Sequence, residues 1–459
     1  MPHPIAGRNV SSSGRDGWGR ALPGGIPALS RRTMLKGLFG AAGLAAAAPV
    51  LAACGGGSGS SSSSSSTDTG TVTFGSNGSD VAPKSAYAAT MAAFTKQSGD
   101  KVKVNTVDHD TFQNTISTYL QGTPDDVFTW FAGYRMQFFA SQGLAHPIDD
   151  VWAKIGANFS DATKALSKGT DGHYYFVPIY NYPWGVFYRK SLFQAKGYEV
   201  PTKWDDFISL AAKMKSDGLV PFSWGYGQGD SWTPLGTFDY LNMRINGYQF
   251  HMDLMHGKES WTDAKVTDVF THYSQLLPYV QQGAAGRKWE DAAQALVAKQ
   301  TGMFTLGLFV AQQFTNPADL ADLDFFAYPE VNPTYGQTSV EAPTDGFMVS
   351  HKVKNLAGAT KLMEFLGSGA AEDAYLAIDN ANVAINSQAD TSKYNALQKK
   401  SVEFISQAKT LSQFGDRDSD PGFVSNVVEP AIAKWLGNPS STTSTQSTIE
   451  SQKSQYFTS

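Results

Sequence analysis

Strand patterns alternate with helix patterns from residue 71 to residue 131, and this alternation constrains the fold more than any other feature. The predicted strands cover residues 71–76, 101–107 and 126–131, and the predicted helices cover residues 85–97 and 111–120. Strands separated by helices at this spacing form βαβ units and a parallel sheet. Ligands of such sheets bind beyond the carboxyl ends of the strands. We therefore expect residues 77–80 and 130–135 to lie on one rim of a ligand site.

Residues 172–207 contain two strand-like runs that are joined by a segment rich in aromatic residues. One β-prone run, 173–179, meets the rings of Tyr180, Tyr182 and Trp184, and a second run, 185–188, comes directly after them. Pro178 and Pro183 push the residues before them toward extended backbone. Two interpretations stay open here. The rings fill the core of a strand pair, or they line a sugar-stacking cleft beside a chain that passes between two lobes.

A second aromatic cluster lies in residues 220–232, where Trp224, Tyr226 and Trp232 stand among three glycines with Gln228 and Asp230. Glycines let a ligand approach the backbone closely. Aromatic rings stack on the apolar face of a pyranose while side-chain oxygens accept its hydroxyl groups. The alternative is a solvent loop with a structural tryptophan.

The remaining pattern continues the α/β alternation. Further predicted strands cover residues 302–309, 323–328 and 345–350, and further helices cover 137–145, 238–246, 266–281, 289–299 and 355–367, with helices dominating 392–436. Residues 202–205 form a capping-box pattern that opens another helix. Trp204 lies on the apolar face of that helix, so we expect it in the core.

The first 53 residues resemble an export signal. Residues 30–36, Ser-Arg-Arg-Thr-Met-Leu-Lys, resemble a twin-arginine signal, and an apolar stretch, 37–53, ends in a lipobox-like Leu-Ala-Ala before Cys54. We expect Cys54 to become a diacylated N-terminus, because two acyl chains give a stable membrane anchor. The alternatives are a lone thiol and an uncleaved membrane helix. Residues 54–70 then form a flexible Gly/Ser tether.

Charge and length limit the partners. The 459 residues are 41% hydrophobic and 17% charged, which suits two lobes rather than one. The formal net charge is −5, and removing the six cations and one acid of residues 1–53 takes it to −10. An acidic chain without a basic run argues against a nucleic-acid partner and against membrane binding by charge.

The sequence provides no support for a cofactor or a metal site. His251 and His256 are five residues apart, a spacing that does not place them together on one helix face. The acidic run 415–420 resembles a calcium loop but has Asn426 where that loop needs a glutamate. We expect a polar loop near the cleft instead, from which Arg417 reaches toward the ligand.

Several segments together resemble the extracellular solute-binding proteins of bacterial ATP-binding-cassette carbohydrate importers, the maltose-binding-protein-like group. They are residues 123–127, 141–149, 172–178, 187–193, 203–207, 302–304 and 345–350. Their order and spacing make the set specific, and the resemblance covers residues 71–450. Other members carry asparagine where Arg189 stands, a position that is not expected to touch the ligand.

The resemblance implies an α/β, two-lobed periplasmic-binding-protein-like fold with three hinge crossovers, near residues 179–182, 343–345 and 381–386. We expect a signal peptide at 1–53 and a tether at 54–70. Lobe 1 is expected to comprise 71–180 plus 345–382, and lobe 2 to comprise 181–344 plus 383–459.

The resemblance also suggests ligand contacts. Trp130 and Phe309 match stacking rings of the family, and Asp230 with Trp232 matches a carboxylate-plus-aromatic pair. Tyr182 lies where the maltose binder has a carboxylate, and Ala132-Gly133 replaces another charged position, so the ligand is expected to differ from maltose. The residues alone add the last three candidates, which are Trp184, Gln228 and Asp345.

The expected function is sugar capture rather than catalysis. The resemblance implies a lipid-anchored, extracytoplasmic binding component, a monomer that closes on a mono- or short oligosaccharide and delivers it to transmembrane permease subunits. One alternative is a non-sugar solute such as a polyamine, although the cleft candidates are mostly aromatic with few acids. The sequence also allows a glycoside hydrolase that uses Asp230 and Asp345 as its paired carboxylates, or a signalling co-receptor.

Overall fold

The computed structural model describes residues 70–457. The predicted signal peptide, Cys54 and almost all of the predicted tether lie outside the described residues. Within residues 70–457, every helix is too short or too polar to span a membrane. The described residues 70–457 group into one compact unit.

The first sheet begins as the sequence predicts. Strands β1 (Thr71–Ser76), β2 (Lys101–Thr106) and β3 (Val127–Phe131) are parallel, and β1 lies between the other two. The helices α1 (Val81–Ser98) and α2 (His109–Gln121) connect them. Both helices begin earlier than predicted, and at α2 the cap is Asp108, which accepts the N–H of Thr111 at 3.0 Å.

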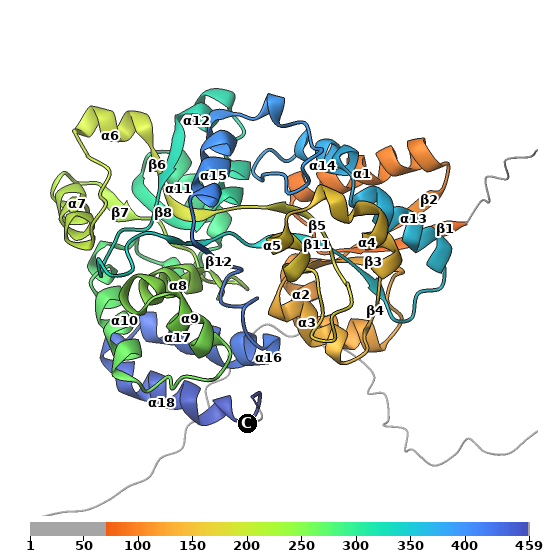
Figure 1. Cartoon of the computed structure of the whole chain (residues 1–459). Helices are drawn as coiled ribbons and strands as arrows, with labels where there is room; N and C mark the ends of the chain where they lie inside the picture. The colour runs from red at the N-terminus through yellow and green to blue at the C-terminus, as the bar shows by residue number, and fades with distance from the viewer. Residues whose placement is uncertain (1–69, 458–459) are drawn as a thin grey trace, which may run out of the picture. The chain divides into compact units, whose positions relative to one another are not determined.

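Later segments complete this sheet in the antiparallel sense. Strand β11 (Thr344–Ser350) pairs with β3, and both β4 (Ala145–His146) and β5 (Val177–Asn181) pair with β11. The surrounding helices are α3 (Tyr134–Ser141), α4 (Asp149–Ile155), α5 (Asp161–Leu166), α13 (Leu356–Leu366) and α14 (Gly369–Leu376). Figure 1 shows these elements together in one lobe.

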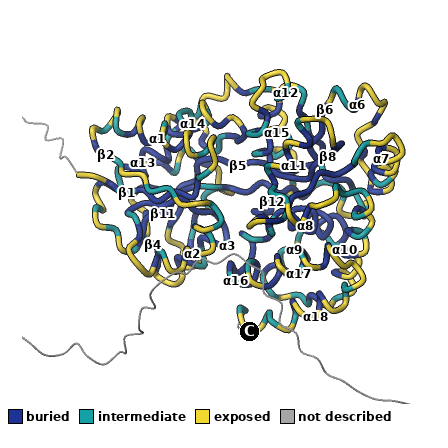
Figure 2. Tube along the Cα trace, turned by 180° about the vertical axis from the view of Figure 1, so that it is seen from behind, coloured by how far each residue is buried: buried dark blue, intermediate teal, exposed yellow. Residues whose placement is uncertain are grey.

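The second lobe contains a four-stranded sheet in the order β7-β8-β6-β9. Its strands are β7 (Val220–Phe222), β8 (Thr301–Gly307), β6 (Trp184–Arg189) and β9 (Leu323–Phe326). Its helices are α6 (Lys190–Lys196), α7 (Trp204–Ser216), α8 (Thr233–Asn246), α9 (Tyr248–Met255), α10 (Ala264–Ser274), α11 (Trp289–Val297) and α12 (Pro317–Asp322). Figure 2 shows buried strands in the interior of each lobe.

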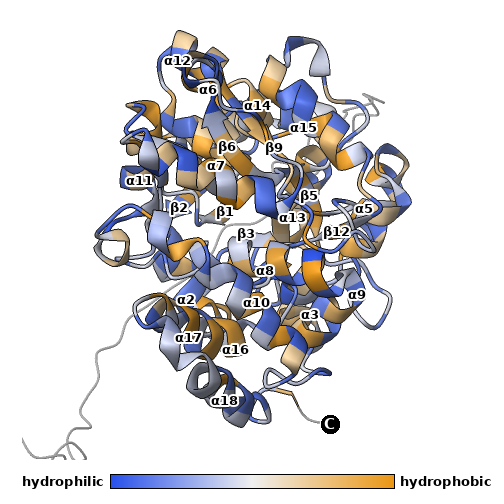
Figure 3. Ribbon diagram, turned by 90° about the vertical axis from the view of Figure 1, so that its left-hand side faces the viewer, coloured by the Kyte–Doolittle hydropathy of each residue, from blue (hydrophilic) through white to orange (hydrophobic). Residues whose placement is uncertain are grey.

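The C-terminal region belongs mainly to this second lobe. It comprises α15 (Ala396–Ser406), β12 (Thr410–Ser412), α16 (Pro421–Phe423), a π-helical turn (Val424–Val428), α17 (Glu429–Leu436) and α18 (Thr442–Lys453). Several of these helices carry both hydrophobic and hydrophilic residues (Figure 3). The Ser/Thr-rich end docks through Gln446, whose Nε2 donates to the Trp261 carbonyl at 2.8 Å.

One local prediction is wrong and another is confirmed at the start of α7. The capping box is wrong, because the N-cap is Lys203 and its side chain makes no capping hydrogen bond. Trp204 is in the core as expected, with 5% of its surface exposed and its indole N–H donated to Gln275 Oε1 at 2.8 Å.

Three segments connect the two lobes and hydrogen-bond to one another. The chain crosses between β5 and β6 at Tyr182, and again between β10 (Ser339–Glu341) and β11 at Pro343. The Tyr182 N–H donates to the Pro343 carbonyl at 3.3 Å. Asn181 and Val383 exchange both backbone hydrogen bonds, at 3.0 and 2.9 Å. The fold is therefore α/β and two-lobed, with crossing segments in the ranges that the resemblance implied.

Arg189 holds the second lobe together away from these crossovers. Its side chain is 1% exposed and forms ion pairs with Asp319 at 2.5 Å and Asp322 at 2.9 Å. Ser191 also donates two hydrogen bonds to Asp322. Burial opposes ionisation of Asp322, but these bonds prevail and lower its pKa to about 2.

We predict that Arg189→Met lowers the free energy of unfolding by about 1.5–3 kcal/mol, because Asp322, which is 16% exposed, loses the hydrogen bond from a buried cation and keeps only Lys299, at 3.5 Å. Urea unfolding of both proteins at neutral pH measures the difference. A loss below about 1 kcal/mol would contradict a structural role for this ion-pair network, because such a value is typical of exposed pairs.

Candidate functional site

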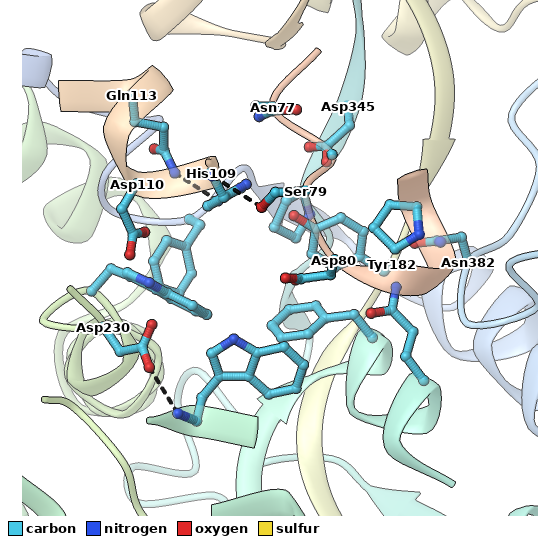
Figure 4. A pocket seen from close by; sticks show the side chains of 18 of the residues that line it. Asn77, Ser79, Asp80, His109, Asp110, Gln113, Tyr182, Asp230, Asp345 and Asn382 are labelled. Carbon is cyan, nitrogen blue, oxygen red and sulfur yellow. Dashed lines mark hydrogen bonds between the residues drawn. The ribbon is translucent and has the colours of Figure 1, made fainter. Parts of the chain in front are cut away.

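A cavity of about 140 Å³ lies where the crossing segments meet the loops of both lobes. Figure 4 shows polar side chains on one side of it and aromatic rings on another. The lining from the first lobe is Asn77, Gly78, Ser79, Asp80, Pro83, Tyr87, Asp108, His109, Asp110, Gln113, Tyr180 and Asp345. The rest is Tyr182, Trp184, Asp230, Trp232, Lys288, Trp289, Glu290, Phe309, Gln312, Pro343, Asn382, Phe414, Asp416 and Arg417.

The loop after β1 lies on the rim, as the parallel-sheet argument predicted. Asn77 is 6% exposed, and its backbone N–H donates to Thr129 Oγ1 at 2.9 Å. Ser79 Oγ accepts the backbone N–H of His109 at 3.1 Å, which joins this loop to the next one. Two neighbouring strand ends thus face the cavity together.

The loop after β2 was missed by the sequence analysis. Asp108, His109 and Asp110 follow this strand, and Gln113 lies one turn further along α2. The side chains of Gln113 and His109 contact each other at 2.7 Å. The rule that located residues 77–80, the carboxyl end of a parallel strand, applies equally here and would have found them.

Aromatic rings form the opposite wall. Trp184, Trp232 and Phe309 lie 6.0–6.1 Å apart between ring centroids, and Trp289 lies 5.1 Å from Phe309. All four rings line the cavity, and the first three were predicted. Trp289 was missed because it opens a helix with no neighbouring signal in the sequence.

Two glycines make room for the rings of this wall. A Cβ atom at Gly236 would lie 2.3 Å from the Trp184 ring, and one at Gly307 would lie 2.4 Å from Phe309 and 3.1 Å from the Trp184 indole nitrogen. Both distances to ring carbons are shorter than van der Waals contact. The small residue before Leu308 and Phe309 is therefore required by the packing of the wall.

Asp230 lies at the junction of this wall with the acidic side. It is 4% exposed, and Oδ2 accepts the backbone N–H of Trp289 at 2.8 Å. Burial raises the pKa of Asp230 to about 7, and the Trp289 hydrogen bond opposes the rise. The carboxyl group can thus accept or donate a hydrogen bond near neutral pH.

Asp345, Tyr182 and Arg417 form a charged cluster beside the crossovers. Arg417 Nη1 lies 2.5 Å from Asp345 Oδ1, and Nη2 donates to the Tyr182 hydroxyl at 2.7 Å. The Tyr180 hydroxyl also donates to Asp345, at 3.2 Å. All four side chains line the cavity, as the sequence predicted for Tyr182, Asp345 and Arg417.

Two predicted contacts lie elsewhere. Trp130 is 1% exposed, packs on Phe112 and Phe139, and donates its indole N–H to the Arg135 carbonyl at 3.2 Å. Gln228 is exposed, and its Nε2 donates to the Gly286 carbonyl at 3.0 Å. Neither residue lines the cavity. Successive side chains of a strand point to opposite faces, so a ring near a strand end can equally enter the core.

The lining is more acidic than the sequence analysis expected. It contains seven carboxylates, including Asp80, Asp110 and Glu290, but only two permanent cations, Lys288 and Arg417. Burial raises the pKa of both Asp110 and Glu290. One Glu290 oxygen is buried without a hydrogen-bond partner among the residues that the structure describes. Such oxygens can accept hydrogen bonds from hydroxyl or ammonium groups of a ligand.

The chain matches a known protein family. The family model for bacterial extracellular solute-binding proteins matches residues 77–373, more than half of the chain. The chain is 22% identical to a probable sugar-binding periplasmic protein of Rhizobium meliloti, over 66% of this chain and 73% of that protein. An uncharacterized ABC transporter extracellular-binding protein of Pyrococcus horikoshii is 24% identical, and the match spans 64% of this chain and 66% of the relative.

A solved structure shows stronger similarity. The bacterial solute receptor AcbH, described as having an exclusive substrate preference for β-D-galactopyranose, is 51% identical to this chain. The alignment covers 84% of this chain and 99% of that protein, with a TM-score of 0.82.

We predict that Asp230→Asn reduces the pH dependence of stability. Because the folded-state pKa of Asp230 is raised, its protonated form contributes stability that is fully present below about pH 4 and is lost as pH rises through about 7. The amide side chain of the variant does not titrate, but its oxygen still accepts the Trp289 N–H. The unfolding midpoint of the wild type should therefore fall relative to that of the variant between pH 5 and pH 8, and parallel profiles would contradict this assignment.

Proposed function

Because the chain belongs to the bacterial extracellular solute-binding proteins, we propose that it captures a sugar between its lobes and delivers it to the permease of an ATP-binding-cassette importer. It acts by binding and has no catalytic role. A ligand that contacts both lobes favours the closed arrangement, which is the state a permease can distinguish from the open one.

One observation carries this proposal: the cavity combines an aromatic wall with a carboxylate-rich side. The wall is Trp184, Trp232, Trp289 and Phe309, and Asp110 and Asp230 face the space beside it (Figure 4). A pyranose has an apolar face for stacking and a rim of hydroxyl groups for hydrogen bonding, so it matches both surfaces.

The size of the cavity favours a monosaccharide. A water molecule needs about 10–15 Å³ of such volume, so 140 Å³ holds roughly ten water-sized groups. One hexose ring with its hydroxyl groups is close to this size, whereas an oligosaccharide exceeds it. The similarity to the galactopyranose receptor AcbH makes D-galactose the first candidate.

The acidic lining favours one alternative. Seven carboxylates surround the cavity, and two of them, Asp345 and Asp416, are paired with arginines. A cationic solute such as a polyamine would form favourable charge interactions with the five carboxylates that are not paired with arginines. Such a solute has no pyranose face to stack on the four aromatic rings, although its cationic groups can lie over a ring face.

The N-terminal features complete the proposal. We place the signal peptide at residues 1–53, the acylated cysteine at position 54 and the tether at 54–70, with export by the twin-arginine route. The lobe boundaries remain those proposed from the sequence, and the body works as a monomer on the extracytoplasmic face of the membrane.

We predict that D-galactose raises the thermal unfolding midpoint of the chain by several degrees at about 100 Kd or more, because selective binding to the native state stabilises it by about 2.7 kcal/mol. The panel contains mono- to trisaccharides and the polyamine spermidine. A rise with spermidine alone would replace the sugar proposal with the alternative, and no rise with any member would contradict both.

Phe309→Leu provides the site-specific test. Loss of a stacking ring costs about 0.5–1.5 kcal/mol, so the sugar Kd should rise about 2- to 12-fold. Phe314→Leu is the matched control, because Phe314 follows on the same segment, is 3% exposed and does not line the cavity. It should lower stability without changing Kd.

We also predict that Cys54→Ser releases the chain from the membrane, since a lipobox cysteine is the acylation site. Membrane and soluble fractions of the producing cell, probed for the chain, measure the change. Equal membrane retention of both proteins would contradict the lipid anchor.

A further inference from the structure

We propose that Arg135 is a positioning residue that joins the two lobes and holds two cavity-lining side chains in place. Arg135 belongs to α3 of the first lobe and does not itself line the cavity. This inference rests on the proposed function only for the identity of the ligand.

The contacts of Arg135 point to both lobes at once. Its Nη1 donates to Gln113 Oε1 at 2.8 Å, within the first lobe, and to Asp416 Oδ2 at 2.6 Å, on the loop after β12. Gln113 and Asp416 both line the cavity. One cationic group therefore fixes the orientation of a hydrogen-bonding side chain on each side of the ligand space.

The ion pair between Arg135 and Asp416 is buried, which strengthens the attraction between its two charges. The side chains of Arg135 and Asp416 are 5% and 13% exposed, so solvent screens them little. The guanidinium lies 5.1 Å from the centroid of Trp130 and 5.2 Å from that of Phe131, and these rings support it. This packing gives Trp130 a role outside the cavity lining, as the support of Arg135.

The backbone around Arg135 also meets the second lobe. The Arg135 N–H donates to the Arg417 carbonyl at 3.2 Å. Gly133 has φ 77°, a conformation that favours glycine, and a Cβ there would lie 3.4 Å from Gln413. The Tyr134 ring stacks on His256 at 5.4 Å between centroids. The start of α3 is thus a further inter-lobe contact, next to the crossing segment at Thr344, whose carbonyl accepts the Ala132 N–H at 3.1 Å.

Through these contacts, the relative position of the lobes determines how the cavity-lining side chains of Gln113 and Asp416 are oriented. If the lobes separate at α3, Asp416 loses its hydrogen bond to Arg135 and keeps only Arg417, at 3.6 Å, and both Asp416 and Gln113 lose their orientation. Removing a contact that forms only when the lobes are together lowers the population of the closed state, from which a ligand contacting both lobes is released slowly. Arg135 should therefore slow ligand release without touching the ligand.

The experiment compares Arg135→Met, Arg135→Lys and the control Arg189→Met in the full chain. Arg189 is an equally buried arginine with two carboxylate partners, and it does not line the cavity. Lysine keeps the charge and can donate to both Gln113 and Asp416, so it should restore part of the lost function. D-galactose is the probe, with Kd from titration and the dissociation rate from tryptophan fluorescence.

A second readout does not depend on any ligand. Spin labels at Asn114 of α2 and Ser451 of α18, both exposed, report the distance between the lobes in a Cys54→Ser background. We expect Arg135→Met to broaden or lengthen this distance and to raise Kd and the dissociation rate by about tenfold. We expect Arg189→Met to change neither.

Each outcome decides the inference. An unchanged label distance in Arg135→Met overturns it, even if no sugar binds and the proposed function fails. A changed distance supports the inter-lobe contact. If galactose binds the wild type but Arg135→Met leaves Kd unchanged and lowers only the melting temperature, as Arg189→Met does, the positioning role is overturned.

Discussion

The backbone hydrogen bonds among the three crossing segments are the constraint on which the rest of the structure depends. Asn181 and Val383 pair in both directions, and Tyr182 bonds to Pro343, so the crossings form one narrow junction. Two separate sheets end on either side of it. Because loops from both sheets converge there, residues as distant as Asn77 and Arg417 line one cavity. The junction thus sets the position of the cavity between the two lobes.

The sequence predicted the elements of the fold well and the cavity in part. Strand β1 has its predicted bounds, because periodicity is a local signal, whereas the positions of the three crossovers came from the family resemblance. Trp184 and Trp232 stand out in aromatic clusters of the sequence, and Phe309 came from the resemblance. Trp130 shows the limit of such reasoning, since the face of a strand on which a ring lies depends on tertiary packing.

The acidic side of the cavity was harder to predict for a physical reason. Glu290 and Asp416 each lie in an ordinary polar segment, and only the folded chain brings them to one place. Their concentration, together with the raised pKa of Asp230, results from tertiary packing and low solvent access rather than from any local pattern. Loops that follow parallel strands are the exception, because topology alone places their ends on the same rim.

The packing of Gly236 and Gly307 against the aromatic wall has an evolutionary consequence. A single methyl group at either position would clash with Trp184 or Phe309, so these rings would have to shift. Ligand preference in a lineage can therefore drift through substitutions at residues that never meet the solute. Conversely, an engineer could narrow the recognition of this receptor by remodelling the layer beneath its binding surface and leaving every contact residue unchanged.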